Sequence, residues 1–212
     1  FLTAIGPFSI DAYLSGFPSI ARDLGTDIEH VALSLTSYFI GISIGQLFYG
    51  PMLDRYGRKR PLIAGLLIYL FASAGCALSP SIYSFILLRF IQAMGGCVGM
   101  VASRAIVRDL FSPHETAKVF SMMMLIMGIA PILAPIIGGT IVVTIGWRYV
   151  FAFLVLLSTA ITFVIVKQLP ESKEPDPSIS FHPLKIVSGY FSLFKNRTFL
   201  IYALASASAS AA

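Results

Sequence analysis

Charge is scarce in this chain of 212 residues. Asp, Glu, Lys and Arg make up only 12% of it, which is about half of the share typical of a water-soluble domain. Cysteine is scarcer still, with two residues, so a small disulfide-stabilised scaffold is excluded. A hydrophobic content of 57% and a mean hydropathy of +0.84 exclude an intrinsically disordered chain.

The positions of the missing charges are informative. Asp, Glu, Lys and Arg are absent from four long stretches, 31–53, 61–88, 119–147 and 149–166. A helix rises about 1.5 Å per residue, so about 20 apolar residues cross the roughly 30 Å of bilayer hydrocarbon. The sequence therefore predicts an all-α, polytopic membrane protein whose partner is the lipid bilayer.

Turn residues divide the apolar stretches into six predicted spans, and a Pro-rich, charged segment follows them. The spans are expected at 1–21, 31–53, 61–78, 82–104, 118–144 and 148–167. We thus expect a six-helix lobe over residues 1–167, a linker over 168–197, and the incomplete start of a seventh span over 198–212. This is the layout of one half of a two-lobed transporter.

The basic residues are distributed unevenly between the two sides of these spans. Twelve of the fifteen Lys and Arg residues fall in the loops between spans 2 and 3, 4 and 5, and 6 and 7. The positive-inside rule predicts that these three loops are cytoplasmic. The net charge of +5 is then explained by topology, and no nucleic-acid partner is expected.

Only two charged residues lie well inside the predicted spans, Asp11 in the first and Arg89 in the fourth. A charge at that depth costs several kcal/mol, so such residues face the interior and usually have a function. Their depths, about 15 Å and about 11 Å from the outer end, suit an ion pair across a cavity. The alternative is a purely structural buried pair that fixes helix register.

A second group of residues follows the second span, in an ordered pattern of glycine, acid and bases. The pattern runs from Gly50 through Asp54, Arg55, Gly57 and Arg58 to Lys59. Basic residues alone would be ordinary cytoplasmic charge, but the ordered set is much more specific.

This set closely resembles the loop signature of the major facilitator superfamily, and three further stretches agree with that resemblance. Residues 88–92 resemble the span 4 motif whose arginine is implicated in proton coupling. Residues 130–139 resemble the span 5 motif of antiporters, and residues 11–18 resemble the span 1 motif of drug:proton antiporters. Together they are most similar to the bicyclomycin/chloramphenicol-resistance (Bcr/CflA) branch of bacterial multidrug exporters, from which Ser15 is a departure.

The resemblance implies a twelve-helix fold of two lobes, of which this chain holds the N-terminal lobe and lacks the C-terminal one. It implies a multi-pass protein of the bacterial cytoplasmic (inner) membrane, with protons as the coupling ion and no other cofactor or metal. The implied roles follow. Proton coupling and the substrate cavity are assigned to Asp11, Tyr13, Arg89 and Gln92; the cytoplasmic gate to Gly50, Asp54, Arg55, Gly57, Arg58, Lys59 and Asp109; and the antiporter motif to Ala130, Pro131, Ala134, Pro135, Gly138 and Gly139.

The antiporter motif has two interpretations. Its two prolines loosen the helix, and its small residues allow close packing, which favours a pliable seam against the other lobe. The alternative is a bent packing helix.

These residues predict a secondary active transporter that exports drugs or other small amphiphilic molecules by proton antiport. A proton-coupled symporter for a sugar or other metabolite is the nearest alternative, and a non-transporting membrane sensor or assembly partner is an alternative of another class. An enzyme is not expected, because Ser/His pairs, paired Asp and metal ligands do not occur in the predicted spans.

Overall fold

The computed structural model describes residues 2–178 and residue 200, and the regular structure in that part of the chain is entirely helical. The elements are the 3₁₀ helix η1 (Leu2–Ala4), α1 (Ile5–Asp11), the 3₁₀ helix η2 (Leu14–Gly16), α2 (Phe17–Asp23), α3 (Ile28–Tyr56), α4 (Lys59–Ala77), α5 (Ile82–Leu110), α6 (Pro113–Thr144) and α7 (Arg148–Gln168). The predicted all-α fold is confirmed.

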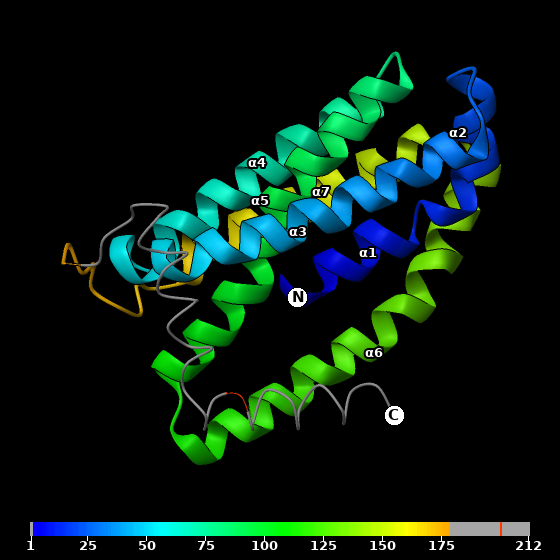
Figure 1. Ribbon diagram of the computed structural model, residues 1–212. Coiled ribbons are helices and arrows are strands. Elements are labelled where there is room, and N and C mark those ends of the chain that lie inside the picture. Colours follow the sequence, from blue (N-terminus) through cyan, green and yellow to red (C-terminus); the bar gives the residue numbers. More distant parts are fainter. Residues whose placement is uncertain (1, 179–199, 201–212) are drawn as a thin grey trace.

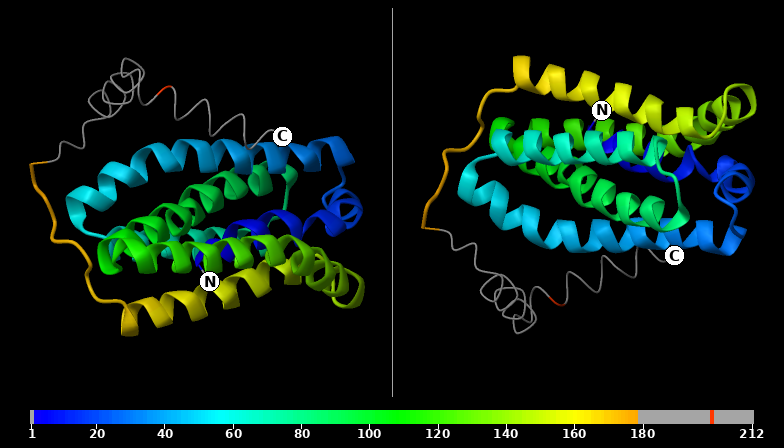
Figure 2. Two further views of the ribbon diagram at one scale, coloured as in Figure 1. Left: turned by 90° about the horizontal axis from the view of Figure 1, so that it is seen from below. Right: turned by 90° about the horizontal axis from the view of Figure 1, so that it is seen from above.

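The long helices lie side by side as a bundle (Figures 1 and 2), in which α5 packs against both α3 and α4, and α7 packs against α4. The short helices α1 and η2 contact α6, which lies along their side of the bundle. Helix α5 is thus central, and its residues Arg89 and Gln92 are fully buried.

Five helices of the described chain, α3 to α7, are long and apolar enough to cross a membrane. They correspond to the second to sixth predicted spans, and α3, α5 and α6 extend beyond the charge-free stretches. Helix α6 begins at a capping box, in which Ser112 and Glu115 satisfy each other's backbone groups. The predicted linker is described only as far as residue 178, and of the predicted start of a seventh span only residue 200 is described.

The first predicted span is not one continuous helix, so the expectation for residues 1–21 was wrong in this respect. Helix α1 ends at Asp11, a 3₁₀ turn follows, and α2 begins at Phe17. Pro18 explains the interruption, because its ring displaces the carbonyl of Leu14 four residues earlier and it has no amide proton to donate. A hydropathy pattern does not detect this break, since the residues on both sides of it are apolar.

Glycines bring α3 close to α5. A Cβ atom on Gly41 would lie 2.6 Å from the carbonyl oxygen of Phe90, and one on Gly45 would overlap Sγ of Cys97. Such close approach between backbones is typical of membrane helices. The close approach of the two helices places Tyr38, one turn before Gly41, at the level of Arg89 on α5.

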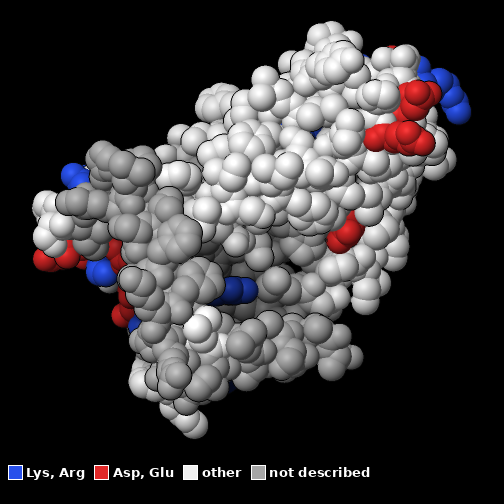
Figure 3. All heavy atoms as spheres, viewed as in Figure 1, with Lys and Arg blue, Asp and Glu red and all other residues white. Residues whose placement is uncertain are grey.

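Charged side chains gather at the two ends of the bundle, and the surface between them is largely uncharged (Figure 3). The α3–α4 and α5–α6 connections and the chain after α7 lie at one end (Figure 1), which is the end predicted to be cytoplasmic. At the other end Asp23 of α2 pairs with Arg148 and accepts a hydrogen bond of 3.1 Å from Nε1 of Trp147. These contacts tie α2 to the α6–α7 turn.

Candidate functional site

Arg89 lies in α5 with no exposed surface. Its Nη1 donates a hydrogen bond of 2.5 Å to Oε1 of Gln92, and its Nη2 donates one of 3.0 Å to the carbonyl oxygen of Ser9. Its guanidinium carbon lies 4.2 Å from the ring centre of Tyr13 and 4.1 Å from that of Tyr38. Two aromatic faces and two neutral oxygens therefore stabilise a buried cation that would otherwise need a carboxylate.

The interruption of the first span supplies one of these acceptors. Because α1 ends at Asp11, its last carbonyl groups have no helical amide to accept from. The carbonyl of Ser9 is in this position and accepts from Arg89 instead. Arg89 thus supplies a donor to a carbonyl that the helix break leaves free, and this carbonyl in turn helps to stabilise the buried cation.

The polar contacts of Arg89 continue into a network that joins three helices. Nε2 of Gln92 donates a hydrogen bond of 2.7 Å to Oγ of Ser73 on α4, and Oγ of Ser9 lies 2.6 Å from the hydroxyl of Tyr69 on α4. These side chains are all buried, so α1, α4 and α5 are held in register around the cation. Nε of Arg89 is the one guanidinium nitrogen for which the described chain provides no hydrogen-bond partner.

Asp11 does not form the expected ion pair with Arg89. The ion pairs among the described residues do not include Asp11, which is half-buried at the end of α1. The depth calculation placed the two residues at similar levels but could not show that Arg89 already has Tyr13 and Tyr38 beside it. The two charges of the predicted spans are therefore accommodated separately.

Arg58 holds together the second cluster, at the end of the bundle that is predicted to be cytoplasmic. Its Nε donates a hydrogen bond of 2.7 Å to Oδ2 of Asp109 on α5, and its Nη1 donates one of 3.0 Å to Oδ1 of Asp54 on α3. Burial alone would lower the pKa of Arg58, but its hydrogen bonds and charge pairing with Asp109 and Asp54 outweigh this and raise it. The structure thus brings together the acid, the base and the second acid of the predicted gate.

Residues just after α7 complete this cluster, and no sequence pattern marked them beyond their place in the predicted linker. The carboxylate of Glu171 accepts hydrogen bonds from the backbone amides of Arg58, at 2.5 Å, and Lys59, at 3.1 Å. Nζ of Lys173 donates one of 2.8 Å to Oδ1 of Asp54. The start of the predicted linker is therefore packed onto the gate residues.

The remaining gate residues surround this contact. Gly57 has a φ of +82°, and a Cβ atom there would lie 2.9 Å from the carboxylate carbon of Glu171, so glycine is needed for both reasons. Nζ of Lys59 donates a hydrogen bond of 3.1 Å to the carbonyl oxygen of Val166 on α7. Gly50 lines the small cavity beside the cluster, whereas Arg55 lies over the ring of Tyr56.

The antiporter-motif residues of α6 divide between two faces. Ala130, Ala134 and Gly138 are buried, and a Cβ atom on Gly138 would overlap the carbonyl oxygen of Ala12 in the interrupted first span. Gly139 lies beside Ser15 of the same region, whereas both prolines are exposed. The buried small residues therefore pack within this lobe, as in the alternative of a packing helix. The seam against another lobe stays a prediction, and it would involve the exposed face that carries the two prolines.

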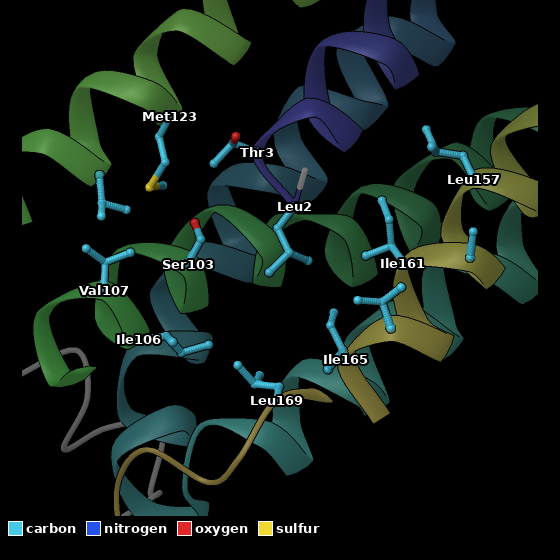
Figure 4. Close-up of a pocket in the computed structure, with 13 residues that line it drawn as sticks. Leu2, Thr3, Ser103, Ile106, Val107, Met123, Leu157, Ile161, Ile165 and Leu169 are labelled. Atoms are coloured by element: carbon cyan, nitrogen blue, oxygen red, sulfur yellow. The ribbon is translucent and has the colours of Figure 1, made fainter. Parts of the chain in front are cut away.

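An apolar cavity of about 520 Å³ lies between α5, α6, α7 and the first described residues (Figure 4). Among the described residues that line it, Ser103 and Thr3 carry the hydroxyl groups, and Met123 points into it from α6. Neither Asp11 nor Arg89 lines it. In the described part of the chain, groups of three or more His, Cys, Asp or Glu side chains that could hold a metal do not occur.

Known proteins are similar to this chain in sequence and in fold. The family described as Major Facilitator Superfamily matches residues 1–212. An uncharacterized MFS-type transporter, YdgK of Bacillus subtilis, is 38% identical over 96% of this chain and 51% of its own length. A bicyclomycin resistance protein homolog of Haemophilus influenzae is 36% identical over 97% of this chain and 52% of its own length.

Among solved structures, a peptide transporter, POT, in complex with sulfate superposes with a TM-score of 0.67 at 18% identity, over 97% of this chain and 45% of its own. At that identity the likeness concerns the fold alone. The chain spans about half the length of the curated relatives it matches.

Proposed function

Because the chain belongs to the major facilitator superfamily, we propose that it is the N-terminal lobe of a secondary active transporter that exports drug-like amphiphilic molecules in exchange for protons. A bicyclomycin resistance protein homolog is 36% identical to this chain. The second lobe, the antiport and the alternating access of the cavity are parts of the proposal. The setting is a multi-pass bacterial membrane protein, in which we place the loops after α3, α5 and α7 in the cytoplasm.

The observation that carries the proposal is the state of Asp11. It is half-buried beside a helix break, and it forms no ion pair with a described residue. Arg89, the other charge within the predicted spans, is held by other groups. A carboxyl group in this position can take up a proton from one side and release it to the other. Protonation and binding of a substrate would then compete for one site, which is the requirement for exchange.

The cluster around Arg58 supplies the second part of the mechanism. It joins the ends of α3 and α5 through Asp54 and Asp109, so these two helix ends move as one body. In the proposed cycle this body meets the other lobe when the cytoplasmic side closes and separates from it when that side opens.

Replacing Asp11 by asparagine in the full-length protein tests the proposal, because the amide keeps the size of the side chain and cannot carry a proton. In membrane vesicles with an imposed pH gradient, we expect Asp11→Asn to abolish gradient-driven drug accumulation at normal expression. Asp27→Asn, at an exposed acid between α2 and α3, is the matched control and should transport normally.

Accumulation by Asp11→Asn at the wild-type rate would refute the coupling role. Reversing the direction of the gradient separates antiport from the alternative of symport, because a symporter accumulates its substrate along the proton flow and an antiporter accumulates it against that flow.

A further inference from the structure

Three consecutive residues that follow α7 each contact a different part of the gate. The carboxylate of Glu171 accepts hydrogen bonds from the backbone amides at the start of α4. Oγ of Ser172 donates one of 3.4 Å to Oδ2 of Asp109. Nζ of Lys173 donates one of 2.8 Å to Oδ1 of Asp54. Residues 171–173, which form no helix or strand, are thus a strap that crosses the ends of α3, α4 and α5.

The two ends of this strap are held differently. Helix α4 has no side-chain cap of its own at Arg58, and the Glu171 carboxylate supplies a negative charge where the helix dipole favours one. The ion pair at the other end joins two partly exposed side chains, Lys173 at 39% and Asp54 at 40%. Exposed ion pairs are weak. The strap is therefore anchored at Glu171 and easily released at Lys173.

Lys173 also completes the charge balance of the gate. Without it, the ion-paired groups are the carboxylates of Asp54 and Asp109 and the guanidinium of Arg58, so one negative charge lacks a partner. Arg108 lines the small cavity beside these residues but forms no ion pair with the described part of the chain. The pairing of Lys173 with Asp54 thus neutralises the gate within this lobe.

We propose that the strap inhibits closure of the gate: while Lys173 occupies Asp54, this carboxylate is unavailable to a partner outside the lobe, and the cytoplasmic side closes only after Lys173 is displaced. The effect on closure rests on the proposed function, whereas the strap itself rests on the contacts of Glu171, Ser172 and Lys173. None of these three residues belongs to the predicted gate motif.

Prolines on both sides make the strap stiff. Pro170 precedes it, and Pro175 follows it with one residue between. Proline fixes its own φ and restricts the preceding residue to extended conformations. A displacement of the chain after Pro175 therefore reaches Lys173 with little slack, and movement of the linker releases Asp54.

The test measures how often the gate is covered in the full-length protein. Ala105 of α5 lines the cavity of about 280 Å³ beside the gate residues, and a surface that docks on the gate covers this cavity. The rate at which N-ethylmaleimide labels the thiol introduced by Ala105→Cys, followed by mass spectrometry of that peptide, reports the uncovered state. Added to this variant, Lys173→Gln should lower the rate about fivefold, which corresponds to about 1 kcal/mol. Lys173→Arg keeps the charge and should restore it.

Two further variants separate the strap from a general effect of charge. Lys167→Gln removes the same charge from the last turn of α7, where the ammonium lies 5.7 Å from the ring centre of Phe163, and it should leave the rate unchanged. Asp54→Asn removes the gate acid and should raise the rate. In the Asp54→Asn background, Lys173→Gln should have no further effect, because Lys173 acts through Asp54.

An unchanged or higher labelling rate in Lys173→Gln would overturn the proposal, as would an equal decrease in Lys167→Gln or a decrease that persists with Asp54→Asn. If Asp54→Asn still raises the rate, the strap alone is wrong and the proposed gate stands. If neither variant changes the rate, the gate is wrong as well. Labelling requires no proton gradient, so the proposed antiport is decided separately by the transport experiment with Asp11→Asn.

Discussion

Replacing Arg58 by lysine keeps the positive charge of the gate cluster and removes its forked geometry. In the structure two different nitrogens of one guanidinium reach two carboxylates, Asp109 at 2.7 Å and Asp54 at 3.0 Å. A lysine ammonium is a single point charge and cannot reproduce two donors in a rigid plane. We therefore expect Arg58→Lys to lose most of one of the two interactions.

The exposure of the partners sets the magnitude. A hydrogen bond to a charged group contributes about 1.5–3 kcal/mol when it is buried, whereas exposed pairs contribute about 0–1 kcal/mol. The side chain of Arg58 is 9% exposed, that of Asp109 20% and that of Asp54 40%. The bond to Asp109 thus belongs near the buried value and that to Asp54 near the exposed one, and we expect a loss of about 1–2 kcal/mol.

A double-mutant cycle isolates this loss. The free energy of unfolding of the full-length protein in mixed micelles is measured for wild type, Arg58→Lys, Asp109→Asn and the double variant. Distant sites add to within about 0.5 kcal/mol, so an interaction energy below that value would refute the reasoning. Arg60→Lys, at an exposed residue in the first turn of α4, is the control and should change the stability little.

Two further predictions concern neighbouring contacts. Glu171→Gln keeps the shape of the side chain but removes the charge that faces the first amides of α4; we expect these amides to exchange hydrogen about fivefold faster, for a loss of about 1 kcal/mol, and unchanged exchange would contradict the contact. Gly138→Ala places a methyl group against the carbonyl of Ala12 and should destabilise the protein by about 1–3 kcal/mol in thermal unfolding. Gly128→Ala adds the same group where no atom of the described chain lies within 4 Å and serves as the control, so equal losses for the two variants would contradict the predicted clash.

Composition and charge spacing were sufficient to predict the fold. The four charge-free stretches lie in α3, in α4 with the start of α5, in α6 and in α7, because a helix satisfies the backbone of such a stretch within one segment in a bilayer. The motif that runs from Asp54 to Arg58 also predicted real neighbours, since the two residues are four apart across the tight turn at Gly57 and Asp109 lies in the last turn of the helix that packs beside them. Local spacing shows which segments are helical, and an ordered motif shows which of its residues are neighbours.

The partners of Arg89 could not be predicted in the same way. Counting residues gives the depth of a side chain but not the direction in which it points, and the preference of arginine for aromatic faces leaves no mark in the spacing of Tyr38 from Arg89. The break of the first span was missed for a related reason, because Pro7 and Pro18 permit either a kinked helix or separate helices. Glu171 and Lys173 were missed because a polar segment after a span is usually a solvated loop.

The order of synthesis bears on how the buried Arg89 is inserted into the membrane. A membrane helix with a central arginine is costly to place in lipid by itself. Ser9, Tyr13 and Tyr38, which surround Arg89 together with Gln92 of its own helix, all precede it in the chain. During synthesis they are made before α5, so these partners are available to the arginine as soon as α5 is made. The ring of Phe151 on α7, whose centre lies 5.8 Å from the guanidinium carbon, is added later.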